Sequence, residues 1–274
     1  MNPLALAQLV ESSEGEAYRA LAIGASTGNE DFVAQEIGGG IAIVSSSITT
    51  TLNLNRVIGL GVYEPATLAH LDEIEHLYGS HGLSFGLEIG PCAQPPDLLD
   101  WVRARRIRRG VQTAMLYRET QRIPAVNGDV HVRAADASEV QVVADICCDA
   151  FRMPSVARRL FKGASNRPEW RLWLAWIGDL PAGAALSYVG TCAAWLGWDA
   201  TVPSFRGRGV QTAMIARRLQ DARNSGCTYA TSETSAGVPG RPDPSFRNYE
   251  RMGFALAYNR TTYVSLTRGP RARA

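Results

Sequence analysis

Hydrophobic positions follow the same order of elements in two stretches of the chain: strand, helix, strand, helix, strand. In the second half, the apolar run 193–198 predicts a buried strand, and apolar residues at helical spacing after position 210 predict a helix. The extended segment 229–233 then leads to a further helix and a strand reaching position 264. In the first half, the corresponding segments are a strand at 57–62, a helix from Thr67, a strand at 83–89, a helix at 98–105 and a strand at 111–117. The matching order indicates two copies of one fold.

The segments that precede these units are also patterned. In the first half they predict a helix over 4–22, with a break at Ser12-Ser13 left open, a turn at Gly38-Gly39-Gly40, a strand at 41–44 and extended structure at 52–60. In the second half they predict a strand at 130–133, a helix over 140–151, a short helix at 158–162 and antiparallel strands at 170–177, 182–189 and 193–198. Asp136 and Glu139 have the spacing of a capping box at the start of the 140–151 helix.

Length and composition fit two compact domains. The chain has 274 residues, of which 46% are hydrophobic. The segment 119–129 contains Pro124 and the pair Asn127-Gly128, and is the best candidate for a linker. No apolar run approaches the 18 residues of a membrane span, and the first residues lack the basic start of a secretory signal. Five cysteines form no Cys-x-x-Cys pair, so we expect reduced thiols, no metal site and a cytoplasmic protein.

Charge is unevenly distributed between the two halves. Residues 1–129 carry 9 basic and 15 acidic side chains, whereas residues 130–274 carry 19 basic and 11 acidic ones. A basic half suits an anionic ligand, because such charge raises encounter rates. No basic-aromatic stripe or nucleic-acid motif accompanies it, so we expect no nucleic-acid partner.

The turn between the 193–198 strand and the following helix is rich in arginine and glycine. Its residues are Val202-Pro203-Ser204-Phe205-Arg206-Gly207-Arg208-Gly209-Val210-Gln211-Thr212. Glycines permit backbone angles that a Cβ forbids, and the helix start presents unpaired N–H groups and the positive end of its dipole. Such a turn binds phosphate. The lysine of a P-loop and the third glycine of a dinucleotide fingerprint are both missing here.

The turn resembles the acyl-CoA loop of the GNAT acetyltransferase superfamily, whose pattern is Arg/Gln-x-x-Gly-x-Gly/Ala. Arg206, Gly209 and Gln211 occupy its three positions, although Gln211 is larger than the usual residue. The segment 248–254 resembles the Tyr-Glu-x-x-Gly-Phe motif of the same superfamily. The resemblance covers residues 130–265. It implies an α/β (α+β) GNAT fold, with a mixed, mostly antiparallel sheet flanked by helices, here in two tandem lobes.

The resemblance also implies the site. Acetyl-CoA would bind where two parallel strands diverge, with the diphosphate at the turn and the pantetheine arm along the end of the first strand. The implied cofactor-binding residues are Asp199, Ala200, Thr201, Arg206, Gly207, Arg208, Gly209, Val210, Gln211 and Thr212. Tyr249 would protonate the departing thiolate, and Glu233 is the candidate general base. An asparagine that the family often has seven residues before the tyrosine is replaced by Pro242.

The N-terminal half is expected to be a degenerate copy that does not bind CoA. Its strand and helix are joined only by Tyr63-Glu64-Pro65-Ala66, which contains no Gly-x-Gly and carries a carboxylate. We therefore divide the chain into a degenerate GNAT-like domain at 1–122, a catalytic domain at 129–266 and a flexible tail at 267–274.

The resemblance implies an acetyl-CoA-dependent N-acetyltransferase that transfers acetyl directly to an amine of a small molecule or peptide. Two alternatives stay open: a non-catalytic acyl-CoA-binding regulator, and a structural two-lobed module. The sequence leaves open the acceptor, the acyl chain length and whether the protein forms a homodimer.

Overall fold

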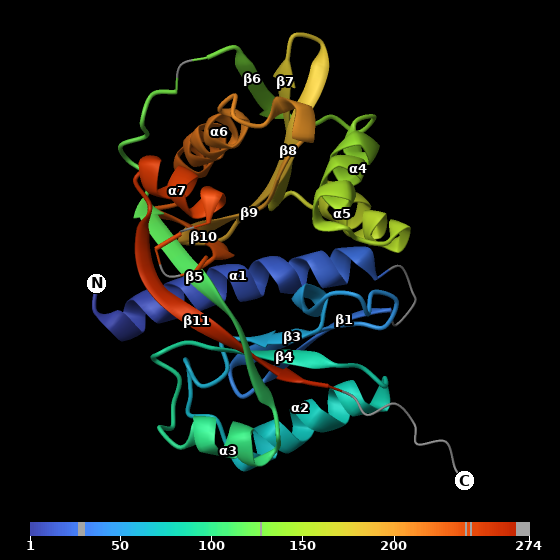
Figure 1. Ribbon diagram of the computed structural model, residues 1–274, viewed down its shortest axis with the longest axis vertical. Helices are drawn as coiled ribbons and strands as arrows, with labels where there is room; N and C mark the ends of the chain where they lie inside the picture. Colours follow the sequence, from blue (N-terminus) through green and yellow to red (C-terminus); the bar gives the residue numbers. More distant parts are fainter. Residues whose placement is uncertain (27–30, 127, 239, 242, 267–274) are drawn as a thin grey trace.

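The computed structural model describes residues 1–26, 31–126, 128–238, 240–241 and 243–266, so the tail at 267–274 lies outside the described residues. The strands form one eleven-stranded sheet in the order β1-β2-β3-β4-β11-β5-β10-β9-β8-β7-β6, with helices on its faces (Figure 1). Most neighbouring strands are antiparallel, and β3–β4 and β9–β10 are parallel. This is the mixed sheet that the sequence predicts.

The N-terminal half contains the predicted helices and strands in order, together with a strand, β1, that was not predicted from the sequence. They are α1 (Pro3–Ala25), β1 (Phe32–Ile37), β2 (Gly40–Ser45), the 3-10 helix η1 (Leu52–Leu54), β3 (Arg56–Ile58), α2 (Leu68–Ser80), β4 (Phe85–Ile89), α3 (Leu98–Ala104) and β5 (Arg108–Glu119).

The C-terminal half has the same order with an extra strand and helix at its start. Its elements are β6 (Val130–Ala134), α4 (Val140–Phe151), the 3-10 helix η2 (Ser155–Ala157), α5 (Arg158–Ser165), β7 (Trp170–Ile177), β8 (Leu180–Val189), β9 (Ala193–Thr201), the 3-10 helix η3 (Pro203–Phe205), α6 (Val210–Asn224), β10 (Tyr229–Ser235), α7 (Pro244–Arg251) and β11 (Ala255–Ser265). The unit β9-α6-β10-α7-β11 therefore repeats β3-α2-β4-α3-β5.

One open point is settled and two local predictions need correction. Helix α1 is continuous through Ser12 and Ser13, whose hydroxyls donate to backbone carbonyls three residues earlier in the helix, at 3.2 and 3.0 Å. The segment 52–54 is a 3-10 helix and not extended. Strand β3 ends at Ile58, earlier than the apolar run 57–62 indicates. The link to α2 therefore contains Gly59-Leu60-Gly61, which is a Gly-x-Gly after all.

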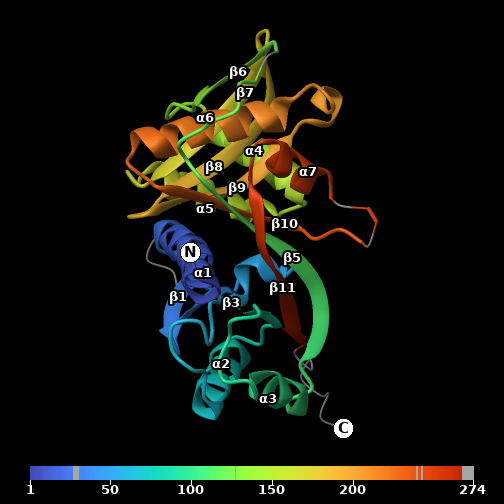
Figure 2. The same cartoon turned by 90° about the vertical axis from the view of Figure 1, so that its left-hand side faces the viewer.

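The last strand of each half pairs with the other half. Strand β5 lies between β10 and β11, and β11 also pairs with β4. Both strands are long and run from one half into the other, as Figure 2 shows most clearly. The exchange joins the two halves into a single sheet.

Helix α1 and a cluster of buried charges lie where the halves meet. Arg260 on β11 contacts Glu14 at 2.6 Å, Glu11 at 2.7 Å and Glu88 at 3.2 Å. Arg56 on β3 contacts Glu14 at 2.7 Å. Removing one partner from such a buried cluster typically costs about 3–5 kcal/mol, because it leaves a charge unpaired. The cluster therefore fixes how the halves sit against each other.

Candidate functional site

The turn between β9 and α6 exposes the start of a helix. Gly207 and Gly209 have φ values of +76° and +79°, which side chains with a Cβ seldom adopt. Beyond their chain neighbours, no described atom lies within 4 Å of where a Cβ would stand on either glycine. Helix α6 begins at Val210, and the first N–H groups of a helix have no acceptor within it. The turn thus offers donors to open space.

A cavity of about 680 Å³ lies in front of this helix start. Its walls include nine of the ten predicted cofactor-binding residues: Asp199, Ala200, Thr201, Arg206, Gly207, Gly209, Val210, Gln211 and Thr212. The tenth, Arg208, does not line this cavity: it forms an ion pair with Asp129, and its guanidinium lies over the Phe205 ring, 5.8 Å from the centroid. We call the cavity in front of the start of α6 the loop cavity.

Strands β9 and β10 diverge beside the loop cavity. They pair in parallel only from Tyr229 with Ala193 to Thr231 with Trp195. Beyond that point β10 continues to pair with β5, and β9 continues to pair with β8 as far as Thr201. The edge of β9 that faces β10 is therefore unpaired near Ala200 and can accept an extended ligand as an added strand.

Gln211, the departure from the family pattern, is held by helix α7. Its amide nitrogen donates to the Ser245 hydroxyl at 2.6 Å, and its amide oxygen accepts from Asn248 at 2.7 Å. These bonds tie the first turn of α6 to α7. The larger side chain therefore has fixed partners beside the cavity.

Tyr249 is fully buried and lies behind the cavity walls. Its hydroxyl donates to Asp199 Oδ2 at 2.7 Å, and the other carboxylate oxygen of Asp199 pairs with the buried Arg218. Burial, reinforced by the Asp199 charge, raises the pKa of Tyr249 well above its usual range. Asp199 itself lines the loop cavity, so it connects the phenol to that space.

A second cavity of about 510 Å³ adjoins the first, and we call it the junction cavity. Phe151, Asp199, Asp243 and Ser245 line both spaces, so the two cavities meet at these residues. Figure 1 shows the diverging ends of β9 and β10 close to α1, at the boundary between the halves.

Glu233 lines the junction cavity. Its carboxylate accepts from Trp195 Nε1 at 2.8 Å and lies 3.7 Å from the Arg56 guanidinium. Burial, together with the nearby Glu14 charge, raises the pKa of Glu233 to about 8. A carboxylate with a pKa near the working pH has the proton affinity that a general base needs.

The N-terminal half supplies part of the junction cavity. Tyr18 from α1, Asn53 from η1 and Arg56 from β3 line it alongside residues of the C-terminal half. Sequence reasoning missed all three, because no local pattern marks a residue that reaches another half's site. The one sign in the sequence was the position of Arg56 beside an apolar run. A charged residue next to a buried strand needs a partner, which indicates a contact elsewhere in the chain.

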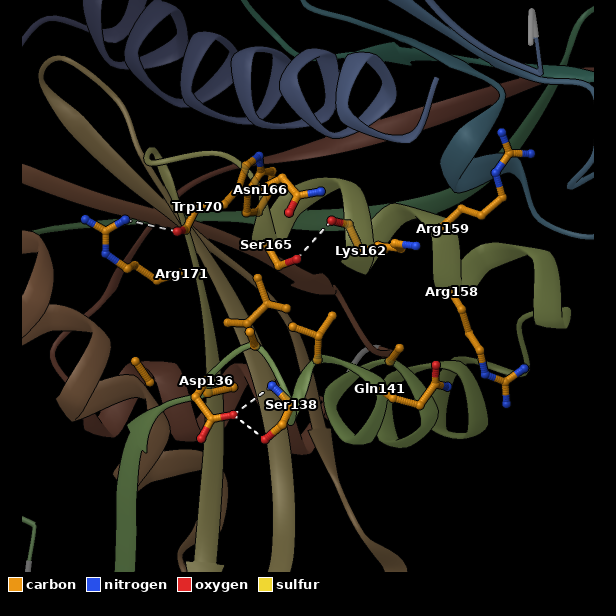
Figure 3. Close-up of a pocket in the computed structure, with 16 residues that line it drawn as sticks. Asp136, Ser138, Gln141, Arg158, Arg159, Lys162, Ser165, Asn166, Trp170 and Arg171 are labelled. Atoms are coloured by element: carbon orange, nitrogen blue, oxygen red, sulfur yellow. Dashed lines mark hydrogen bonds between the residues drawn. The ribbon is translucent and has the colours of Figure 1, made fainter. Parts of the chain in front are cut away.

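A third cavity, of about 560 Å³, lies between β6–β7 and α4–α5 (Figure 3). Its arginines have carboxylate partners: Arg158 pairs with Asp145 and Arg159 with Asp31. The Asp136 carboxylate accepts from Ser138. None of the predicted site residues lines this space, so it is separate from the candidate site.

Within the described residues, none of the helices combines the length and the apolar character of a membrane span. No group of three or more His, Cys, Asp or Glu residues in that part of the chain is placed to hold a metal ion.

Comparisons with known proteins reveal the fold. No family model matches the chain, and no curated protein sequence does. A GCN5-related N-acetyltransferase from Kribbella flavida superimposes with a TM-score of 0.65 at 16% identity, covering 92% of this chain and 95% of that chain. A GCN5-related N-acetyltransferase from Sphaerobacter thermophilus gives 0.62 at 14% identity, over 84% and 81% of the two chains.

A tandem GNAT protein from the clavulanic acid biosynthesis pathway matches over both halves. Its TM-score is 0.60 at 14% identity, covering 89% of this chain and 86% of that one. At such identities the likeness establishes the fold. The chain therefore has the GNAT fold, with the tandem arrangement that the repeated order of elements predicts.

Proposed function

We propose that this GNAT-fold protein is an acetyl-CoA-dependent N-acetyltransferase acting on an amine of a small molecule or peptide. One observation carries the proposal: the open helix start at Gly207–Gly209 faces a cavity that meets, at Asp199, a second cavity lined by Glu233. A diphosphate site and a base-lined acceptor site are thus adjacent. Residues 129–266 form the proposed catalytic unit, and residues 1–122 form the degenerate copy.

The residues present fit acetyl-CoA. Backbone N–H groups from Gly207 to Thr212 would hold the diphosphate, since a helix start attracts anions. The unpaired edge of β9 at Asp199, Ala200 and Thr201 would hold the pantetheine arm. Arg206, at the rim of the loop cavity, would add a positive charge. Acetyl-CoA, when bound, supplies the acetyl thioester.

Glu233 would take a proton from the acceptor ammonium, directly or through water, which frees the amine lone pair. The amine nitrogen then forms the bond to the acetyl carbon, the carbon–sulfur bond breaks, and the nitrogen releases its second proton to water, which leaves a neutral amide. Tyr249 would give the departing sulfur its proton, and its raised pKa keeps the phenol protonated until then. In this structure that proton is donated to Asp199, so the phenol must turn or relay through the carboxylate.

The position of Tyr249 also favours one alternative, a non-catalytic acyl-CoA-binding regulator. A phenol behind the cavity walls and bonded to Asp199 is not yet aimed at a reacting sulfur. The loop cavity is compatible with both functions, so binding alone does not separate them.

Two measurements test the proposal. Calorimetry with acetyl-CoA should give a saturable heat, and CoA release should rise when a panel of primary amines is added. Binding without amine-dependent CoA release would favour the regulator. Absence of any heat would remove both functions and leave the structural two-lobed module.

A further inference from the structure

The junction cavity has the size of a small-molecule site. Its volume of about 510 Å³ falls in the range of roughly 300–1,000 Å³ that such sites usually have. Its walls come from both halves of the chain, so its shape is set by their packing. This favours a compact ligand over a folded protein surface.

The charged side chains of the junction cavity favour a cation. Three carboxyl groups line it, those of Asp199, Glu233 and Asp243. Asp199 is paired with the buried Arg218, and Glu233, with a pKa raised to about 8, holds its proton below that pH, so the negative charge that favours a cation comes mainly from Asp243. Among its described lining residues, Arg56 is the single cation, and it already contacts Glu14 at 2.7 Å and Glu88 at 3.4 Å. An anionic group on a ligand would therefore meet carboxylates and no unshared positive charge, which makes its burial costly.

Aromatic side chains form another part of the wall. Tyr18 lies edge-on to Trp195 with ring centroids 5.4 Å apart, and Phe151 lies edge-on to Trp198 at the same distance. All four line the junction cavity. Aromatic walls stabilise a flat apolar ligand by area burial and ring–ring contact, and they attract a cation to their faces.

We propose that the junction cavity binds a primary amine that a short alkyl chain joins to an aromatic ring and that lacks a carboxylate, and that Tyr18 of the N-terminal half helps to select the ring. The identification of this amine as the acetyl acceptor rests on the proposed function. The binding itself does not. The N-terminal half, expected to be a degenerate copy that does not bind CoA, thereby acquires a part in choosing the acceptor.

Direct calorimetric binding to the full chain, without acetyl-CoA, tests the ligand class. The reference probe is 2-phenylethylamine. It is compared with phenylalanine, which adds a carboxylate, and with propylamine, which lacks the ring. We expect 2-phenylethylamine to bind at least about tenfold more tightly than either, a difference of about 1.4 kcal/mol. Equal or tighter binding of phenylalanine, equal binding of propylamine, or no binding of 2-phenylethylamine would overturn the proposal.

Substitutions at two positions, Asp243 and Tyr18, test the residues. Asp243 accepts from the Ser245 N–H at 2.8 Å at the start of α7, and asparagine caps a helix equally well. Asp243→Asn therefore removes charge while keeping the cap, and should weaken 2-phenylethylamine binding several-fold. Tyr18→Leu should narrow the gap between 2-phenylethylamine and propylamine, whereas Tyr18→Phe should keep it. Unchanged binding in Asp243→Asn together with an unchanged gap in Tyr18→Leu would contradict the assignment.

Tyr63→Leu is the matched control, since Tyr63 belongs to the same half but lies outside the cavity walls. If Tyr18→Leu does not fold, Phe151→Leu replaces it, because the Phe151 side chain is partly exposed and its loss is tolerated more easily. Calorimetry with acetyl-CoA is run on every variant. Lack of acetyl-CoA binding would contradict the proposed function. The amine-binding data would still test whether the junction cavity binds the proposed class of amine.

Discussion

The two halves contain the same strand–turn–helix unit, but only one of the two turns is open. After β9, Gly207 and Gly209 face empty space and a cavity, and no side chain caps the start of α6. After β3, Gly61 has a similar φ of +80°, yet a Cβ there would stand 2.6 Å from the Gln94 carbonyl. The protein's own chain fills the place that a ligand would take.

The start of α2, the helix that corresponds to α6 in the N-terminal half, is closed as well. The Thr67 hydroxyl accepts from the His70 N–H at 3.1 Å and so caps α2, and the Ala66 N–H donates to Gln94. The N-terminal half therefore keeps the glycine conformation but uses these donors in hydrogen bonds within the protein. The comparison shows that a Gly-x-Gly turn alone does not make a phosphate site; open space and unused donors are required as well.

The largest effect expected is on catalysis, at a glutamate whose strand, β10, corresponds to β4 in the other half. Glu233→Gln should lower kcat by about 100-fold or more, as loss of a general base does. Glu88→Gln, in the corresponding strand β4, should instead lower stability, because Glu88 contacts Arg260 and Thr262 and does not line the junction cavity. Steady-state kinetics and thermal unfolding of both variants separate the two roles.

The same residue sets a pH dependence. Because the folded-state pKa of Glu233 is raised to about 8, its base form accumulates as pH rises through about 8. In the wild type kcat/KM should therefore rise with pH up to that region, and the rise should vanish in Glu233→Gln. For the same reason, the stability that this group contributes is present at low pH and lost as pH rises through about 8. A Glu233→Gln profile identical to that of the wild type would place the base elsewhere.

Substitution at the open turn should affect binding. Gly209→Asp puts a carboxylate and a strained backbone where the diphosphate is proposed to dock, so acetyl-CoA affinity should fall by about 100-fold, or about 2.8 kcal/mol. Gly226→Asp is the control, because Gly226 has a φ of +84° and open space at the other end of the same helix. Equal affinity losses in both variants, measured by calorimetry, would refute the assignment of the turn.

Substitution at the closed turn should affect folding. Gly61→Ala should lower the free energy of unfolding by about 1–3 kcal/mol, because it adds backbone strain and a clash with the Gln94 carbonyl. Acetyl-CoA affinity at a temperature where the variant is folded should stay unchanged. Denaturant unfolding measures the free energy of unfolding, and calorimetry measures the acetyl-CoA affinity. A loss of affinity without a loss of stability would show that this turn also binds ligand.

The smallest expected effect concerns the phenol. Tyr249→Phe removes one hydroxyl and its bond to Asp199, so kcat should fall several-fold, by roughly 1–1.5 kcal/mol in activation free energy, with acetyl-CoA affinity kept. An assay of CoA release measures kcat, and titration calorimetry measures the acetyl-CoA affinity. An unchanged kcat would leave Tyr249 a packing residue and move the proton source elsewhere.

Local patterns predicted most of the elements, and pairing across the chain explains what they missed. The spacing of Leu71, Ile74 and Tyr78 identifies α2 because a helix buries one face. By contrast, β5 carries no mark of its partner β10, since its alternation states only that one face is buried. The end of β3 was misplaced because Leu60 and Val62 are buried in a turn and extend the apolar run.

The same limit applies to the candidate site. The resemblance placed the turn at Gly207–Gly209, because its residues are consecutive. Tyr18 and Arg56 lie far from it in sequence and reach the junction cavity only through the packing of the two halves. The raised pKa of Glu233 comes from burial and then from the charge of Glu14 in the other half, whereas Arg56 of that half lowers it.

The crossing of β5 and β11 makes each half depend on the other to cover the edges of its part of the sheet. An excised residue 129–266 fragment would present two long bare edges, along β10 and β11, where β5 now lies. Unprotected edges of that kind recruit strands from other molecules and precipitate. Because each half has its last strand in the other half's part of the sheet, neither half can be removed without baring an edge in the half that remains.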